Sequence, residues 1–171
     1  MRALKNFLPV LAVIFLSGCA GYHLGSVNGD VAGEKTVEVK PFNNQTPQPR
    51  LGDDVTQALR ERLQTDATYR LVTDGEPGDL VVSGVIRSYT RVGLGSLNQD
   101  SSTMQNYRVA VAVHVTVRER VSGKLRLDRE VQGTTLVNVG PDFASSERQA
   151  APLLAANLAQ NITALLTEGA W

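Results

Sequence analysis

The chain has 171 residues, enough for one domain with a substantial core, and its 17 basic residues balance 17 acidic ones. This balance gives no support for a nucleic-acid partner. One cysteine and two histidines leave no set of residues with the spacing of a standard metal cluster.

The first 19 residues have the form of an export signal. Arg2 and Lys5 precede the apolar run Phe7–Leu16, which is too short to span a bilayer and is typical of a signal peptide. Cys19 directly follows Leu-Ser-Gly, and this resembles a bacterial lipobox, in which the cysteine thiol receives a diacylglycerol. The alternative is an ordinary signal peptide that contains a cysteine by chance. We predict lipidation of Cys19, with this covalent lipid as the only non-protein group and no cofactor.

Cleavage before Cys19 removes residues 1–18 and leaves 153 residues with a formal charge of −2, since two basic residues leave with the signal. Lipoproteins of this kind carry three acyl chains, and two or more chains hold a protein stably on a membrane. Ala20 stands where an aspartate would retain the protein in the inner membrane, so we expect the periplasmic side of the outer membrane. Residues 19–34 are predicted to form a lipidated tether, and residues 35–171 a single α/β sandwich domain.

The first part of the domain predicts a strand followed by a helix. Residues 36–40 alternate apolar and polar side chains, and Pro41 ends that strand. Turn-forming residues fill 42–49. Two aspartates, Asp53 and Asp54, suit the N-terminus of an amphipathic helix at about 52–66. A short extended piece at 69–72 and a turn at 74–78 follow.

Three alternating segments then predict an antiparallel meander with one apolar face. They are 79–91, 107–118 and 124–136, and Val121-Ser122-Gly123 is a tight hairpin connection between the last two. The predicted apolar face holds Leu80, Val82 and Ile86, then Tyr107 and the valines at 109, 111, 113, 115 and 117, then Leu125, Leu127 and Val131.

A helix closes the chain, with an apolar stripe of Leu154, Leu158, Ile162 and Leu165. Its start is ambiguous, because Ser146 to Gln149 fits a capping box but Pro152 would kink that helix or mark a start near Ala151. The predicted fold class is α+β: a mixed four-stranded sheet in the order strand-helix-strand-strand-strand-helix, with both helices packed on one face. The first two strands are expected to be parallel.

No pattern of an enzyme is present: the sequence lacks a nucleophile elbow, and Gly93 to Ser96 lies between strands instead of before a helix. The polar sheet face is the main candidate site, and two interpretations stay open. It is an ordinary solvated face, or it docks phosphorylated lipid or an acidic protein wall through bidentate arginines. The candidate contacts are Arg87, Arg91, Arg108, Arg118, Lys124 and Arg126, together with Tyr89 and His114. Loop 93–106 is a disordered connection or an insertion that orders against a partner.

The order of these motifs resembles one family. A lipobox, then Gly21-Tyr22-His23-Leu24, then the run from Val37 to Thr46 and an acidic-capped helix are similar to the lipopolysaccharide-assembly lipoprotein family LptE. Residues 79–84, Tyr107-Arg108-Val109 and the closing helix fit the same pattern. Family members place glycine directly after the lipidated cysteine, whereas Ala20 intervenes here.

This resemblance implies a mixed sheet with two helices on one side, and a plug role inside the outer-membrane β-barrel LptD. It implies that the chain helps LptD to assemble and to deliver lipopolysaccharide to the surface of a Gram-negative cell. Two further readings stay open: a periplasmic lipoprotein that activates a peptidoglycan synthase or acts in secretion, and a lipid-binding carrier.

Overall fold

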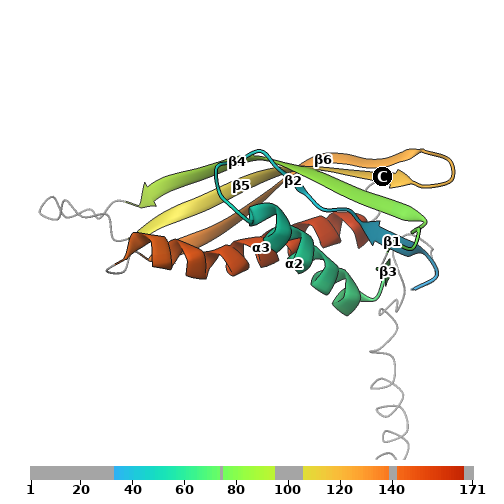
Figure 1. The fold of residues 1–171 in the computed structure, drawn as a ribbon, viewed down its shortest axis with the longest axis horizontal. Helices are drawn as coiled ribbons and strands as arrows, with labels where there is room; N and C mark the ends of the chain where they lie inside the picture. The colour runs from blue at the N-terminus through green and yellow to red at the C-terminus, as the bar shows by residue number, and fades with distance from the viewer. Residues whose placement is uncertain (1–32, 74, 95–105, 139–141, 168–171) are drawn as a thin grey trace, which may run out of the picture.

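The computed structural model of the chain describes residues 33–73, 75–94, 106–138 and 142–167. These form two layers, a sheet and a pair of helices beneath it (Figure 1). The predicted signal peptide, Cys19, most of the tether and residues 95–105 of the loop lie outside the described residues. Neither described helix combines the length and the apolar character needed to cross a membrane.

The sheet is mixed, as predicted, but the described residues form six strands in it instead of four. Their order is β3-β1-β4-β5-β6, and β2 also pairs with β4. β1 is parallel to β3 and β4, while β4, β5 and β6 are antiparallel to one another. The strands are β1 Thr36–Val39, β2 Asn43–Asn44, β3 Arg70–Val72, β4 Leu80–Leu94, β5 Asn106–Glu119 and β6 Leu125–Asn138.

The two additional strands are too short to carry a periodic signal. β2 has two residues within the predicted loop, and β3 has three within the predicted extended piece. Both exist because their backbone groups pair with β4 and β1, which the sequence of such a short segment does not reveal.

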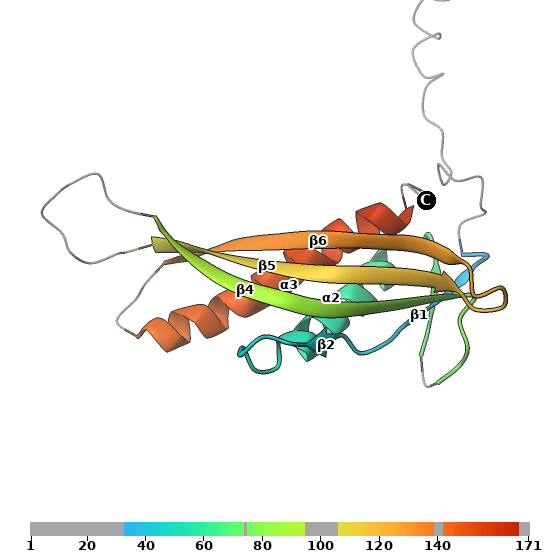
Figure 2. The same ribbon diagram turned by 90° about the horizontal axis from the view of Figure 1, so that it is seen from above.

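The core lies between the sheet and the helices α2, Leu51–Asp66, and α3, Phe143–Thr167. Each valine on the predicted apolar face of β5 is at most 1% exposed. Both helices cover that face, and the view from above shows the other face of β4, β5 and β6 uncovered (Figure 2). The predicted arrangement of strands and helices is therefore confirmed, and we call the uncovered side the open face.

The start of α3 differs from both predictions. Asp142 caps the helix, because its carboxylate accepts hydrogen bonds from the backbone N–H groups of Ala144 at 3.1 Å and Ser145 at 3.2 Å. The capping box at Ser146 is therefore wrong, and Pro152 lies inside the helix. The helix passes through the proline because the buried stripe continues on both sides of it, from Ala150 to Leu154.

α3 comes unusually close to the edge strand β6 at Gly133. A Cβ atom on that glycine would lie only 2.3 Å from Cγ of Leu158, so this position has no room for a side chain. On either side of Leu158, α3 also bonds to the outward backbone of β6. Asn157 Oδ1 accepts from the N–H of Thr134 at 3.0 Å, and Asn161 Nδ2 donates to the carbonyl of Gln132 at 2.8 Å.

Candidate interaction surfaces

Three of the predicted basic contacts lie on the open face. Arg108 and Arg118 alternate with buried residues of β5, and Arg87 follows the buried Ile86 of β4. All three are exposed. No ion pair to any of the three is recorded within the described part of the chain, which leaves their guanidinium groups available to a ligand.

Arg91 does not lie with them, because a β-bulge in β4 reverses the alternation. Ile86 pairs with Val113, but Ser88 pairs with Ala112, so Arg87 and Ser88 together face one residue of β5. Beyond the bulge, Arg91 pairs with Val109, which is buried on the helix side. The prediction that Arg91 projects from the polar face is therefore wrong, and the same correction applies to Tyr89, which pairs with Val111.

A second irregularity lies at the other end of the open face. Val117 pairs with Leu127 but Arg118 pairs with Leu125, so Arg126 is the extra residue. Leu125 consequently leaves the apolar face on which we predicted it and is 41% exposed. Lys124 precedes β6 and lies in the hairpin connection instead of the strand.

The remaining candidates do not form one cluster. Arg108 and Arg118 are separated by ten residues of β5, which is about 34 Å of extended strand. Arg118, Lys124 and Arg126 lie at one end of the open face, whereas Arg87 faces Ala112, four positions of β5 from Arg108. Near the middle of β5, His114 Nε2 lies 2.7 Å from a carboxylate oxygen of Asp128, so this histidine already has a partner.

On the helix side, Arg91 belongs to a cluster that joins the sheet to α3. Its Nε lies 2.6 Å and its Nη2 2.9 Å from the two carboxylate oxygens of Glu147, a bidentate ion pair. Tyr89 donates its hydroxyl hydrogen to the same carboxylate at 2.5 Å. The guanidinium also lies 4.9 Å above the Tyr89 ring and 5.9 Å from the ring of Phe143, which stacks on Tyr107.

The cluster changes the acidity of its members. The hydrogen bonds from Arg91 are the main reason why the pKa of Glu147 lies below its ordinary value, although burial acts in the opposite direction. Burial, followed by the hydrogen bond to Glu147, raises the pKa of Tyr89. At neutral pH the cluster therefore holds a carboxylate, a guanidinium and a neutral phenol, which is a structural arrangement and not that of a poised acid or base.

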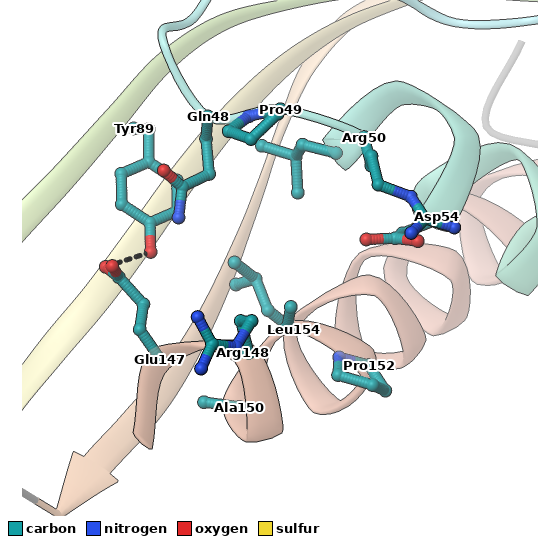
Figure 3. Close-up of a pocket in the computed structure, with 12 residues that line it drawn as sticks. Gln48, Pro49, Arg50, Asp54, Tyr89, Glu147, Arg148, Ala150, Pro152 and Leu154 are labelled. Carbon is teal, nitrogen blue, oxygen red and sulfur yellow. Dashed lines mark hydrogen bonds between the residues drawn. The ribbon is translucent and has the colours of Figure 1, made fainter. Parts of the chain in front are cut away.

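A cleft of about 380 Å³ opens beside this cluster, between the loop before α2 and the first half of α3. Tyr89 and Glu147 of the cluster line it, and Gln48, Arg50, Asp54 and Arg148 supply its other polar side chains (Figure 3). The sequence did not reveal this α2–α3 cleft, because its lining comes from three segments that are far apart in the chain. Among the residues that the structure describes, no group of three or more metal-ligating side chains gathers there or elsewhere.

Glu147 is the residue that sequence reasoning missed, although a signal was present. It lies three and seven residues before Ala150 and Leu154, at the spacing of the buried stripe of α3, and is 8% exposed. A carboxylate on an apolar stripe requires a basic partner. That requirement points to an arginine on the covered face of the sheet.

Comparison with known proteins identifies one family. Residues 34–166 match the model of LptE, described as lipopolysaccharide-assembly. No curated protein matches the sequence significantly.

Three solved structures share the fold. The hypothetical protein CT253 from Chlamydia trachomatis is 12% identical, with a TM-score of 0.56 over 79% of this chain and 96% of that one. A candidate lipoprotein from Caulobacter crescentus is 12% identical, with a TM-score of 0.52 over 74% of this chain and 88% of that one. Protein XCC0632 from Xanthomonas campestris is 8% identical, with a TM-score of 0.54 over 78% of this chain and 85% of that one. At such identities the likeness shows the fold alone.

Proposed function

The chain belongs to the LptE lipopolysaccharide-assembly family, and we propose that it acts as the lipid-anchored partner of the LptD β-barrel. The family assists LptD assembly and lipopolysaccharide insertion, and it is not enzymatic. The finer statements of our proposal concern this chain itself: that it binds LptD directly, that Cys19 anchors it in the outer membrane, and that it contacts lipopolysaccharide.

One observation carries the proposal. The family match runs from residue 34 to residue 166 and so includes every described strand and both helices almost to their ends. A match of this extent concerns the whole domain and not a shared motif. The open face supports the proposal, because it offers the barrel a large surface that neither helix covers.

The anchor rests on Cys19 and its surroundings. A short basic region, ten apolar residues and Leu-Ser-Gly precede the only cysteine in the chain. With the cysteine acylated, the domain stays at the periplasmic surface of the outer membrane, where a barrel partner is inserted.

Co-purification of LptD tests the partner. A tagged chain is isolated from outer membranes solubilised in mild detergent, and one large β-barrel protein is expected in stoichiometric amount. An untagged strain and a tagged, unrelated outer-membrane lipoprotein serve as controls. Recovery of a peptidoglycan synthase or a secretion component without the barrel would contradict the proposal and favour the alternative functions.

For lipopolysaccharide, we propose Arg87 and Arg108 on the open face as contacts for its phosphate groups. Both are exposed and lack recorded ion pairs in the described residues, and arginine binds phosphate through two parallel hydrogen bonds. Charge-assisted contacts contribute about 1.5–3 kcal/mol each, so losing two should weaken binding more than tenfold.

The test is the double variant Arg87→Glu with Arg108→Glu, compared with Arg62→Glu on the exposed side of α2. Lipopolysaccharide affinity and LptD association are measured separately. Unchanged lipopolysaccharide affinity at low salt would refute these contacts. Lost barrel association with intact lipid binding would assign the two arginines to the protein partner.

A further inference from the structure

The hairpin that joins β5 to β6 differs in composition from the rest of the chain. Residues 118–126 carry four basic side chains and one acidic one, a net charge of +3 within a chain whose net charge is zero. Val121 at the tip is 94% exposed, and Leu125 is 41% exposed. Exposed apolar side chains set among basic ones are the pattern of a segment that rests on an anionic membrane surface.

Part of this basic charge is free to act on a partner. Arg126 is bound to Glu119 at 3.0 Å, and Arg120 lies 3.5 Å from Glu38. For Arg118 and Lys124, by contrast, no ion pair is recorded within the described ranges, and both residues are exposed.

The β-bulge at Arg126 is what brings the apolar side chain to the surface here. Without the extra residue, Leu125 would continue the buried alternation of Leu127 and Val131. With it, Leu125 lies opposite Arg118 on the open face, so apolar and basic groups stand side by side at this end of the sheet.

The hairpin is also tied to the place where the chain enters the domain. The N–H of Arg120 donates to the carbonyl of Asp79 at 2.8 Å, and the Asp79 carboxylate accepts from both the N–H and the hydroxyl of Thr36, the first residue of β1. Figures 1 and 2 both show β1 and the β5–β6 hairpin at the same end of the molecule.

The length of chain before the domain limits where this end can lie. Cys19 precedes Gly33, the first described residue, by 14 positions, and 14 residues span at most about 50 Å. An anchor at Cys19 therefore keeps this end of the domain within about 50 Å of the membrane surface, so the hairpin is able to reach it.

We propose that the β5–β6 hairpin, residues 118–126, rests on the anionic phospholipid headgroups of the membrane that holds the Cys19 anchor. Arg118 and Lys124 bind headgroup phosphates, and Val121 enters the interfacial layer. The contact orients the domain on its tether, so that the open face is roughly perpendicular to the membrane surface instead of lying flat on it. This inference rests on the anchor proposed above, and it is independent of LptD.

The experiment uses the full lipidated protein in vesicles. Because Cys19 is the only cysteine and is acylated, Val121→Cys supplies a single free thiol for a polarity-sensitive dye. Leu136→Cys is the matched control, an exposed apolar residue near the other end of β6. The vesicles contain phosphatidylcholine alone or with phosphatidylglycerol, and neither contains lipopolysaccharide. Acylation of Cys19 is checked first by mass spectrometry.

The dye at position 121 is expected to report an apolar environment in vesicles with phosphatidylglycerol and an aqueous one without it. Each basic residue near an anionic surface contributes about a fivefold factor, so Arg118→Glu with Lys124→Glu should lower the ratio of bound to free hairpins more than about 25-fold. Arg62→Glu on α2 should leave it unchanged. Soluble phosphate at moderate concentration should not displace the hairpin.

Several outcomes would overturn the inference. They are an equal signal in both kinds of vesicle, an equal signal at position 136, or a signal that requires added LptD, which would assign the hairpin to the barrel. An unacylated Cys19 would remove the anchor and this inference together, whereas acylation without a hairpin signal would leave the anchor standing and reject the hairpin contact alone.

Discussion

Arg91 of β4 and Glu147 of α3 form a bidentate ion pair, with Nε to Oε1 at 2.6 Å and Nη2 to Oε2 at 2.9 Å. The pair holds the first turns of a long helix against the outer half of a strand. The Glu147 side chain is only 10% exposed, whereas Arg91 is 44% exposed, so the carboxylate depends on this partner for its charge to be tolerated.

Arg91→Ala is expected to destabilise the domain. It leaves the buried Glu147 carboxylate without its only cationic partner in the cluster, with hydrogen bonds from Tyr89 and Gln48 remaining, at a cost of about 2 kcal/mol. In a domain of this size that lowers the melting temperature by about 4–8 °C. Arg108→Ala on the open face is the control and should change the melting temperature little. Equal effects of both variants would show that the ion pair contributes no stability.

The same pair should make stability depend on pH. Hydrogen bonds from Arg91 lower the folded-state pKa of Glu147 below its ordinary value of 4.5. Its contribution is therefore complete above that value and is lost as the pH falls through the folded-state pKa. Glu147→Gln should be less stable than the wild type at neutral pH, and the gap should narrow below pH 4.5. Urea denaturation of both proteins across this range measures the gap, and a constant gap would contradict the prediction.

Val113→Asp should destabilise the domain severely. Val113 is fully buried in the middle of β5, and an unpaired carboxylate there costs several kcal/mol of a total stability of about 5–15 kcal/mol. Ala112→Asp places the same group on the open face and should cost much less. The melting temperatures of the two variants test this prediction. A melting temperature of Val113→Asp close to that of the wild type would show that this face of β5 is not buried.

Gly133→Ala should also destabilise, because the new Cβ would lie 2.3 Å from Cγ of Leu158. Overpacking of this kind costs about 1–3 kcal/mol. Leu158→Ala alone creates a cavity, but combined with Gly133→Ala it should recover part of the loss, which a double-mutant cycle measures. Strict additivity of the two changes would show that the helix does not approach the strand at this point.

Cys19→Ala should release the protein from the membrane without unfolding it, because this cysteine precedes the periodic part of the chain. Membrane fractionation measures attachment, and a thermal melt of the purified protein measures folding. Ser26→Ala in the same spacer is the control and should remain attached. A Cys19→Ala protein that stays in the membrane after LptD is removed would rule out the lipid anchor.

The regular parts of this fold could be predicted from side-chain periodicity alone. The valines of β5 alternate over most of the strand, and the apolar stripe of α3 repeats over several helical turns. Patterns of this length show which side of each element is buried. The predicted apolar faces of β4 and β5 are buried as expected.

The predicted side-chain orientations were wrong where one extra residue in a strand moves the following side chains to the opposite face of the sheet. The bulge after Ile86 moves Arg91 from the open face to the helix side, and the extra residue at Arg126 exposes Leu125. A strand's alternation has a period of two, so a single insertion inverts every position beyond it. The sequence of β4 contains no feature that marks the insertion. Only the need of Glu147 for a basic partner could have revealed it.

Asn157 and Asn161 have a consequence for how copies of this chain meet one another. β6 ends the order of the sheet, and an edge strand with free backbone groups is where identical molecules add to each other and grow into fibrils. The two asparagine side chains occupy the outward groups of Gln132 and Thr134 in the middle of that edge. A neighbouring copy therefore cannot extend the sheet across its centre unless α3 first detaches. Crowding at a surface raises the frequency of such encounters, and here the barrier against polymerisation is supplied by a helix.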